Sequence, residues 1–214
     1  MYCPICEKGF LKFLRYGGRQ NAMCPNCGSL ERHRLIYLFL KNETNFKKPS
    51  KRILHFAPEY SIQNKLKKIH GENYTSADIE HPSAKLNFDI TKIPFKKDTF
   101  DLVICSHVIQ EVKYDKKAIS EIFRVLKKKG VAIILCPVDE KRKRTYENKN
   151  AKTSKERAAE FGYYGAIRVY GKDFVKKLES PGFNVNTADY SKIFSNEKFK
   201  RYGLCREKIY ICTK

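Results

Sequence analysis

Two apolar runs in the second half of the chain constrain its fold more than any other feature. The first is FDLVICSHV, residues 100–108, and the second is VAIILCPV, residues 131–138. The stretch between them, YDKKAISEIFRVLKKK, has the apolar spacing of a helix, which we expect Gly130 to stop. Strands that are apolar on both faces and joined by a helix are typical of a parallel sheet covered on both sides.

The chain after Arg52 repeats this alternation. Three stretches predict further strands: RILHFAP, NYTSADI and AKLNFDI. Two stretches predict further helices: SIQNKLKKI and GKDFVKKLESPGF. Near the end, NVNTADY and CREKIYICT predict two strands that are joined by a polar loop and pair antiparallel at the sheet edge. The expected fold class is α/β, with a doubly wound and mostly parallel sheet.

The start of the chain carries two Cys-x-x-Cys pairs, a spacing typical of a zinc ribbon. Two intervening residues let both sulfurs of a pair turn toward one ion, and two pairs complete a tetrahedron. Four thiolates leave no open position, so the predicted zinc is structural. Redox-active pairs and chance are the alternatives. The predicted ligands are Cys3, Cys6, Cys24 and Cys27.

The second knuckle leads into GSLERHRLIYLFLKNE, which has the apolar spacing of a helix, with Ser29 placed as its N-cap. His33 is expected to face the main domain. NFKKPSKR then has the composition of a polar linker. We therefore predict a zinc ribbon plus linking helix over residues 1–45 and a second domain over residues 46–214.

The chain is strongly basic, with 44 Lys and Arg against 23 Asp and Glu. Such an excess can serve nucleic-acid binding. The basic residues are scattered in short runs, however, as expected of solvated surfaces, so a nucleic-acid partner is not favoured. The apolar runs are shorter than the roughly 20 residues of a membrane span. With no signal-peptide pattern at the start, the expected location is the cytoplasm.

Doubly wound folds bind ligands beyond the carboxyl ends of their parallel strands. The residues that the predicted strands place at this edge are Ala57, Pro58, Glu59, Asp78, Asp89, Ser106, His107 and Asp139.

The order of these elements resembles the class I S-adenosylmethionine-dependent methyltransferases, especially in IPFKKDTFDLVICSHV and RVLKKKGVAIILCPV. More narrowly, the chain is similar to type 11-like methyltransferases with an N-terminal zinc ribbon, which share CGSLERHR, an APE turn and RVYG. This resemblance covers nearly the whole chain. It implies S-adenosylmethionine as the cofactor and methyl transfer as the reaction, without fixing the substrate.

The resemblance also implies roles for residues at the sheet edge. Asp78 would accept hydrogen bonds from the ribose hydroxyls, and Asp89 would meet the adenine amino group. Ala57 stands where the class usually has glycine, and Glu59 could hold the cofactor's ammonium. The full expected cofactor set is Ala57, Pro58, Glu59, Asp78, Ile79, Asp89, Ile90 and Ser106.

The acceptor motifs depart from the family pattern. HVLEHV has become HVIQEV, and FGQ-x-DH-x-RVYG has become FGYYGAIRVYG. We expect His107 to act as the general base, with Glu111 orienting it or holding the acceptor. The expected substrate contacts are Asp139, Tyr146, Arg168 and Tyr170.

A small-molecule or sugar hydroxyl is the leading acceptor, because no NPPY-like tetrapeptide follows the strand predicted over FDLVICSHV. Two alternatives stay open. One is an RNA methyltransferase or RNA-binding protein that uses the ribbon and the basic surface. The other is a methyltransferase fold that has lost catalysis and serves as a scaffold.

Overall fold

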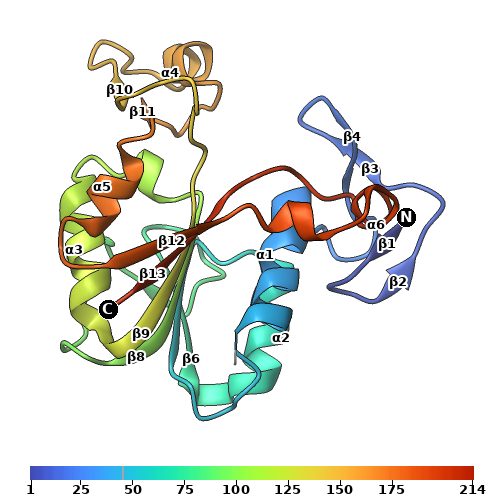
Figure 1. Ribbon diagram of the computed structural model, residues 1–214, viewed down its shortest axis with the longest axis horizontal. Helices are drawn as coiled ribbons and strands as arrows, with labels where there is room; N and C mark the ends of the chain where they lie inside the picture. Colours follow the sequence, from blue (N-terminus) through green and yellow to red (C-terminus); the bar gives the residue numbers. More distant parts are fainter. Residues whose placement is uncertain (45) are drawn as a thin grey trace.

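The computed structural model describes residues 1–44 and 46–214. Its centre is a seven-stranded sheet with the order β12-β13-β9-β8-β5-β6-β7 (Figure 1). The strands from β9 to β7 are parallel, and β12 and β13 form the expected antiparallel pair at one edge. The predicted fold class is therefore confirmed. The strands are β5 (Ile53–Phe56), β6 (Tyr74–Asp78), β7 (Leu86–Asn87), β8 (Phe100–Ser106), β9 (Leu126–Leu135), β12 (Asn184–Ala188) and β13 (Ile209–Thr213).

Helices cover both faces of this sheet. In β8, Val103 and Cys105 join one hydrophobic cluster, whereas Leu102 and Ile104 join another. Because successive strand side chains point to opposite faces, the two clusters are the two halves of the core. The first half packs against α3 (Asp115–Val125) and α5 (Phe174–Glu179), and the second against α1 (Glu31–Glu43) and α2 (Tyr60–His70).

Two predicted elements differ in extent. The helix before β9 ends at Val125 rather than at Gly130, which lies inside β9. Leu126 is fully buried and pairs with Phe100 of β8, so burial in the sheet ends the helix early. The strand expected over AKLNFDI is reduced to the two residues of β7.

The ribbon consists of two small hairpins, and its core is continuous with the main core. Phe13 of the ribbon, Leu35 of α1 and Ile53 of β5 belong to the same hydrophobic cluster. The division into residues 1–45 and 46–214 stays a prediction, and residue 45 lies outside the described residues. The ribbon strands are β1 (Tyr2–Cys3), β2 (Lys8–Gly9), β3 (Leu14–Tyr16) and β4 (Arg19–Met23).

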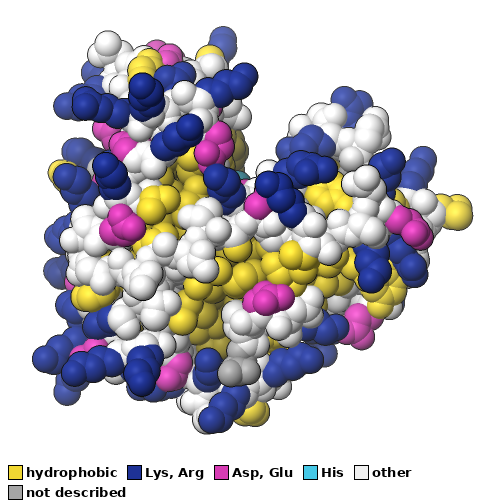
Figure 2. All heavy atoms as spheres, in the orientation of Figure 1, with side chains coloured by type: hydrophobic (Ala, Val, Ile, Leu, Met, Phe, Trp, Pro, Cys, Tyr) yellow, Lys and Arg dark blue, Asp and Glu magenta, His cyan; other side chains and the backbone are white. Residues whose placement is uncertain are grey.

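Two connections rise above the carboxyl ends of the parallel strands. The first follows β9 and contains β10 (Tyr146–Glu147), α4 (Ser154–Phe161) and β11 (Arg168–Val169). The second joins β12 to β13 through α6 (Asn196–Tyr202) and contacts the ribbon (Figure 1). Between them the surface is hollowed, and hydrophobic side chains form its floor (Figure 2). The remaining single-turn helices are η1 (Gly71–Asn73), η2 (Ile109–Glu111) and η3 (Tyr190–Ile193).

Candidate functional site

The four knuckle cysteines converge on one point. The Sγ atoms of Cys3 and Cys27 lie 3.6 Å apart, and those of Cys6 and Cys24 lie 3.7 Å apart. All four sulfurs fall within 4.8 Å of one another. Four Zn–S bonds of about 2.3 Å place tetrahedral sulfurs roughly 3.8 Å apart, so the cluster has the size of a zinc site.

Ser29 serves this cluster instead of the helix. The N-cap of α1 is Leu30, not Ser29 as the sequence suggests. The hydroxyl of Ser29 lies 3.3 Å from the sulfur of Cys3 and 3.2 Å from that of Cys27. A hydroxyl beside two thiolates can donate a hydrogen bond to one of them. This buried side chain therefore bonds to the sulfur cluster instead of capping α1.

Arg34 fastens the ribbon to the rest of the chain. This fully buried side chain donates hydrogen bonds to the backbone carbonyls of Ala22 in β4, of Tyr202 at the end of α6 and of Gly203 just after it. Burial lowers the pKa of Arg34, while the nearby cysteine thiolates oppose that effect. One cation therefore joins three segments next to the sulfur cluster.

The edge expected to bind the cofactor has an unusual backbone. Ala57 follows β5 with φ of 44°, and His107 follows the neighbouring strand β8 with φ of 56°. Left-handed conformations are uncommon outside glycine and concentrate at functional sites. Ala57 thus adopts the conformation that glycine usually provides, three residues before α2 begins at Tyr60.

The two expected acids of the cofactor site lie on neighbouring turns. Asp78 ends β6, and its Oδ1 accepts hydrogen bonds from the backbone of Glu80 and His81. Asp89 is exposed after β7 and accepts from the backbone of Thr91. Ile79 is exposed, whereas Ile90 is buried. Each acid stabilises its own turn, which leaves one carboxylate oxygen without a hydrogen bond within the described chain.

Glu59 lies inside the protein between two histidines. Its Oε2 is 3.0 Å from Nε2 of His55 in β5, and its Oε1 is 3.9 Å from Nε2 of His33 in α1. Burial raises the pKa of Glu59, but hydrogen bonding and charge from His55 outweigh it and hold that pKa near 2. The expectation that His33 faces the main domain agrees with this contact.

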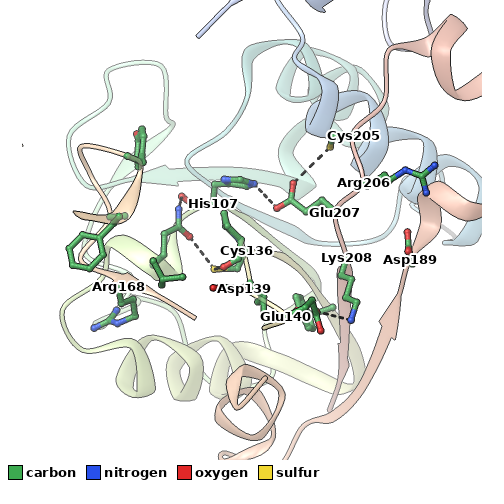
Figure 3. Close-up of a pocket in the computed structure, with 18 residues that line it drawn as sticks. His107, Cys136, Asp139, Glu140, Arg168, Asp189, Cys205, Arg206, Glu207 and Lys208 are labelled. Atoms are coloured by element: carbon green, nitrogen blue, oxygen red, sulfur yellow. Dashed lines mark hydrogen bonds and ion pairs between the residues drawn. The ribbon is translucent and has the colours of Figure 1, made fainter. Parts of the chain in front are cut away.

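The main cavity, of about 660 Å³, lies above β8, β9 and β13 (Figure 3). Its lining includes His107, Asp139 and Arg168 of the sequence-predicted residues, but none of the expected cofactor residues. His107 therefore stands at the boundary between the cavity and the edge that holds Ala57. The aromatic side chains in the lining are Phe161, Tyr163 and Tyr210.

His107 is oriented by a residue that the sequence alone did not single out. Its Nε2 lies 2.7 Å from Oε1 of Glu207, which precedes β13 (Figure 3). Because β13 runs antiparallel to β9, its first residues return to the edge where the parallel strands end. The sequence signal that could have predicted this contact is Glu207 in CREK, an acid directly before a strand expected to run antiparallel.

Glu111, expected to orient His107, does not bond to it. Its carboxylate neighbours Gly165, where a Cβ atom would approach Oε2 to 2.7 Å. Burial raises the pKa of Glu111, and the nearby His107 opposes that rise. The Glu111 carboxylate therefore lies next to FGYYGAIRVYG, the second motif that departs from the family pattern. A residue larger than glycine at position 165 would collide with this carboxylate.

The four expected substrate contacts separate into two groups. Asp139 lines the cavity and pairs with Arg142, with Oδ2 and Nε 3.1 Å apart. Arg168 reaches the lining, yet its Nε pairs with Glu147 at 2.7 Å and its other nitrogens donate to backbone carbonyls.

Tyr170 is fully buried and donates to Asp115. Tyr146 donates to Glu160 away from the cavity lining. Three of the four thus hold the connection after β9 in place.

Comparison with known proteins finds similarity to methyltransferases over part of the sequence. The family model described as the methyltransferase domain matches residues 60–134, from α2 into β9. An uncharacterized protein of Methanocaldococcus jannaschii is 47% identical over 51 residues, which are 24% of this chain and 22% of that protein.

Solved structures show the same fold across most of the chain. An S-adenosylmethionine-dependent methyltransferase from Mesorhizobium loti has a TM-score of 0.60 at 10% identity, covering 84% of this chain and 98% of that one. The [4+2]-cyclase SpnF has a TM-score of 0.58 at 13% identity, covering 98% and 89%. A methyltransferase from Archaeoglobus fulgidus has a TM-score of 0.54 at 14% identity, covering 84% and 93%.

At such identities the structural likeness shows the fold, and the family match adds a methyltransferase domain over residues 60–134. No helix within the described residues is long and apolar enough to cross a membrane. The match over residues 60–134 and the matching fold agree with the resemblance: the chain contains a methyltransferase domain and has the fold of the class I S-adenosylmethionine-dependent methyltransferases.

Proposed function

We propose that this protein methylates a hydroxyl group of a small molecule or sugar, with His107 as the general base. S-adenosylmethionine supplies the electrophilic methyl group in this reaction. The observation that carries the proposal is the bond between His107 and Glu207 beside the main cavity. If Glu207 accepts the Nε2 proton, Nδ1 is left unprotonated and can take a proton from an acceptor hydroxyl.

The residues at the cofactor edge fit the predicted ligand. Ala57 leaves the turn after β5 open through its left-handed backbone. The hydroxyl of Ser106 is buried without a hydrogen-bond partner among the described residues. Such an orphaned group is uncommon in a folded protein and indicates a missing partner. Asp78 and Asp89 would bind the ribose and adenine ends.

Titration calorimetry with S-adenosylmethionine and S-adenosylhomocysteine tests the cofactor assignment. Transfer of a labelled methyl group to a panel of phenols, sugars and RNA then tests the acceptor class. Micromolar cofactor binding and labelling of a hydroxyl compound are expected. Absence of binding would favour the scaffold alternative, and labelling confined to RNA would replace the small-molecule acceptor.

Asp78→Ala should weaken binding of S-adenosylhomocysteine by about 1–3 kcal/mol, because buried ribose hydroxyls would lose a charged acceptor. Asp78→Asn is the matched control for the turn, since its side-chain oxygen can still accept from the backbone of Glu80 and His81. Calorimetry should rank the wild type above both variants. Undiminished binding by Asp78→Ala would place the cofactor elsewhere.

We further propose that Cys3, Cys6, Cys24 and Cys27 hold one structural zinc ion. The sulfur separations and the hydroxyl of Ser29 beside two sulfurs support this assignment. A four-thiolate set offers no open coordination position, so the ion would stabilise the ribbon without taking part in methyl transfer.

The basic surface should prove diffuse. Lys and Arg side chains spread over every lobe in Figure 2, and the four residues of the run Lys141-Arg142-Lys143-Arg144 are all exposed. We expect no tight complex with ribosomal or transfer RNA at about 150 mM salt, where charges are screened beyond about 8 Å. Filter binding across a salt series measures this. A nanomolar complex that survives this salt and weakens on charge reversal of the run would favour the RNA methyltransferase alternative.

A further inference from the structure

The first turn of α1 carries two polar groups that the ribbon and the core leave without partners. Arg32 Nε and His33 Nε2 are both buried, and neither has a hydrogen-bond partner among the described residues. Both belong to the ERHR stretch, residues 31–34, which is separated from the end of the second knuckle by three residues. Buried donors are nearly always paired in folded proteins, so two neighbouring unpaired donors point to a ligand.

The protonation state of His33 is set by its other nitrogen. The backbone N–H of Leu30 donates to Nδ1 of His33 at 3.2 Å, so Nδ1 must be unprotonated. Burial lowers the pKa of His33 to about 4, so the ring is neutral near pH 7. Its single proton therefore lies on Nε2, which is a fixed donor.

This donor faces the turn that begins the cofactor edge. His33 Nε2 lies 3.9 Å from Oε1 of Glu59, too far for a hydrogen bond. Glu59 is itself held by His55 and immediately follows Ala57 and Pro58. Helices α1 and α2 contact each other, and they overlap in Figure 1. A ligand on the Ala57 turn would meet a carboxylate and a neutral donor together.

Arg32 adds a positive charge that two residues of the cavity wall experience. Burial raises the pKa of Tyr163 and of Cys205, and the charge of Arg32 opposes that rise in both. Both residues line the main cavity, so the guanidinium lies within electrostatic range of its wall. Arg32 forms no ion pair within the described part of the chain, which leaves its charge available to a ligand.

We propose that Arg32 and His33 bind the carboxylate at the amino-acid end of S-adenosylmethionine, so that the helix after the ribbon completes the cofactor site. This inference rests on the proposed function. An amino-acid end is zwitterionic, and the site offers matching groups: Glu59 for the ammonium, and a guanidinium and an imidazole N–H for the carboxylate. The ribbon then has a functional role, because it fixes the first turn of α1.

The test compares two ligands that differ in the amino-acid end. S-adenosylhomocysteine carries it, and 5′-methylthioadenosine lacks it. Arg32→Gln removes the charge without breaking any hydrogen bond that the structure gives this side chain. It should weaken S-adenosylhomocysteine binding about 10- to 100-fold, the loss of one charged hydrogen bond, and leave 5′-methylthioadenosine binding unchanged.

His33→Gln should weaken S-adenosylhomocysteine about 3- to 10-fold, because the lost donor is neutral. A Gln at this position can still accept from the backbone of Leu30, as in a capping box, so α1 keeps its start. Lys41→Gln, in the last turn of the same helix, is the matched charge control. Equal zinc content in all variants would show an intact ribbon.

The outcomes separate this inference from the proposed function. If the wild type binds neither ligand, the proposed function fails and the inference fails with it. If the wild type binds both, unchanged S-adenosylhomocysteine affinity in Arg32→Gln overturns the inference alone. Equal weakening of both ligands would also overturn it, because the effect would not depend on the carboxylate.

Discussion

Cys24→Ser is expected to release the zinc ion and unfold the ribbon, the largest stability effect that the structure predicts. Structural zinc contributes on the order of 10 kcal/mol in small zinc domains, comparable to the whole stability of a typical protein. The loss should spread beyond the ribbon, because Phe13 and Cys24 share a hydrophobic cluster with Leu35 of α1 and Leu135 of the sheet. Arg34, buried beside the cluster, would also lose the thiolate charge that balances it.

Elemental analysis should find about one zinc per wild-type chain and nearly none in Cys24→Ser. Amide hydrogen exchange should become fast in the ribbon and in the first turns of α1. Cys205→Ser is the matched control, since Cys205 is partly buried but lies outside the four-sulfur cluster. Zinc-free wild-type protein, purified under reducing conditions, would refute the assignment.

The sheet could be predicted from the sequence because its signals are local. Continuous apolar strands, helix spacing and the two knuckles each occupy fewer than about twenty residues, and parallel order follows from their alternation. The residues at the ends of β5, β6 and β8 could be listed for the same reason, since a parallel sheet aligns those ends.

The contacts that complete the site are long-range, and local patterns do not carry them. Glu207 meets His107 across 100 positions of sequence, through the antiparallel return of β13. Glu111 lies one helical turn beyond His107 in the sequence, which favours it as the residue that orients His107. The chain after β8 instead forms the short helix η2, and the Glu111 carboxylate lies next to Gly165. The local signal for an N-cap predicts that role for Ser29, whereas its hydroxyl lies beside sulfurs that come from both knuckles.

The family element RVYG shows that retained motif residues do not by themselves identify substrate contacts. Its retained residues suggested substrate contacts, because polar residues near a predicted ligand edge favour that interpretation. Arg168 instead donates to Glu147 and to carbonyls around η2, and Tyr170 donates to Asp115 under the cavity. These bonds fix the wall of the cavity, so the residues can matter for function without touching a substrate.

His107→Asn should lower the rate of methyl transfer about 10²- to 10⁴-fold, the usual contribution of a positioned general base. Asn tolerates the left-handed backbone of His107 better than most residues, so a loss would report chemistry rather than strain. Binding of S-adenosylhomocysteine should stay within about twofold of the wild type, because His107 borders the cavity rather than lying among the expected cofactor residues.

Glu207→Gln separates orientation from charge in the same pair. The Gln oxygen can still accept from Nε2 of His107, so the ring keeps its position, but the charge that stabilises the protonated imidazole is lost. The rate should fall by about tenfold, less than in His107→Asn, since the base itself remains and only the charge beside it is removed.

Glu140→Gln is the matched control, because Glu140 also lines the cavity but pairs with Lys208. Single-turnover rates with labelled cofactor measure all three variants. An unchanged rate in His107→Asn would exclude this residue as the base, and a larger loss in Glu140→Gln than in Glu207→Gln would assign the catalytic carboxylate to Glu140.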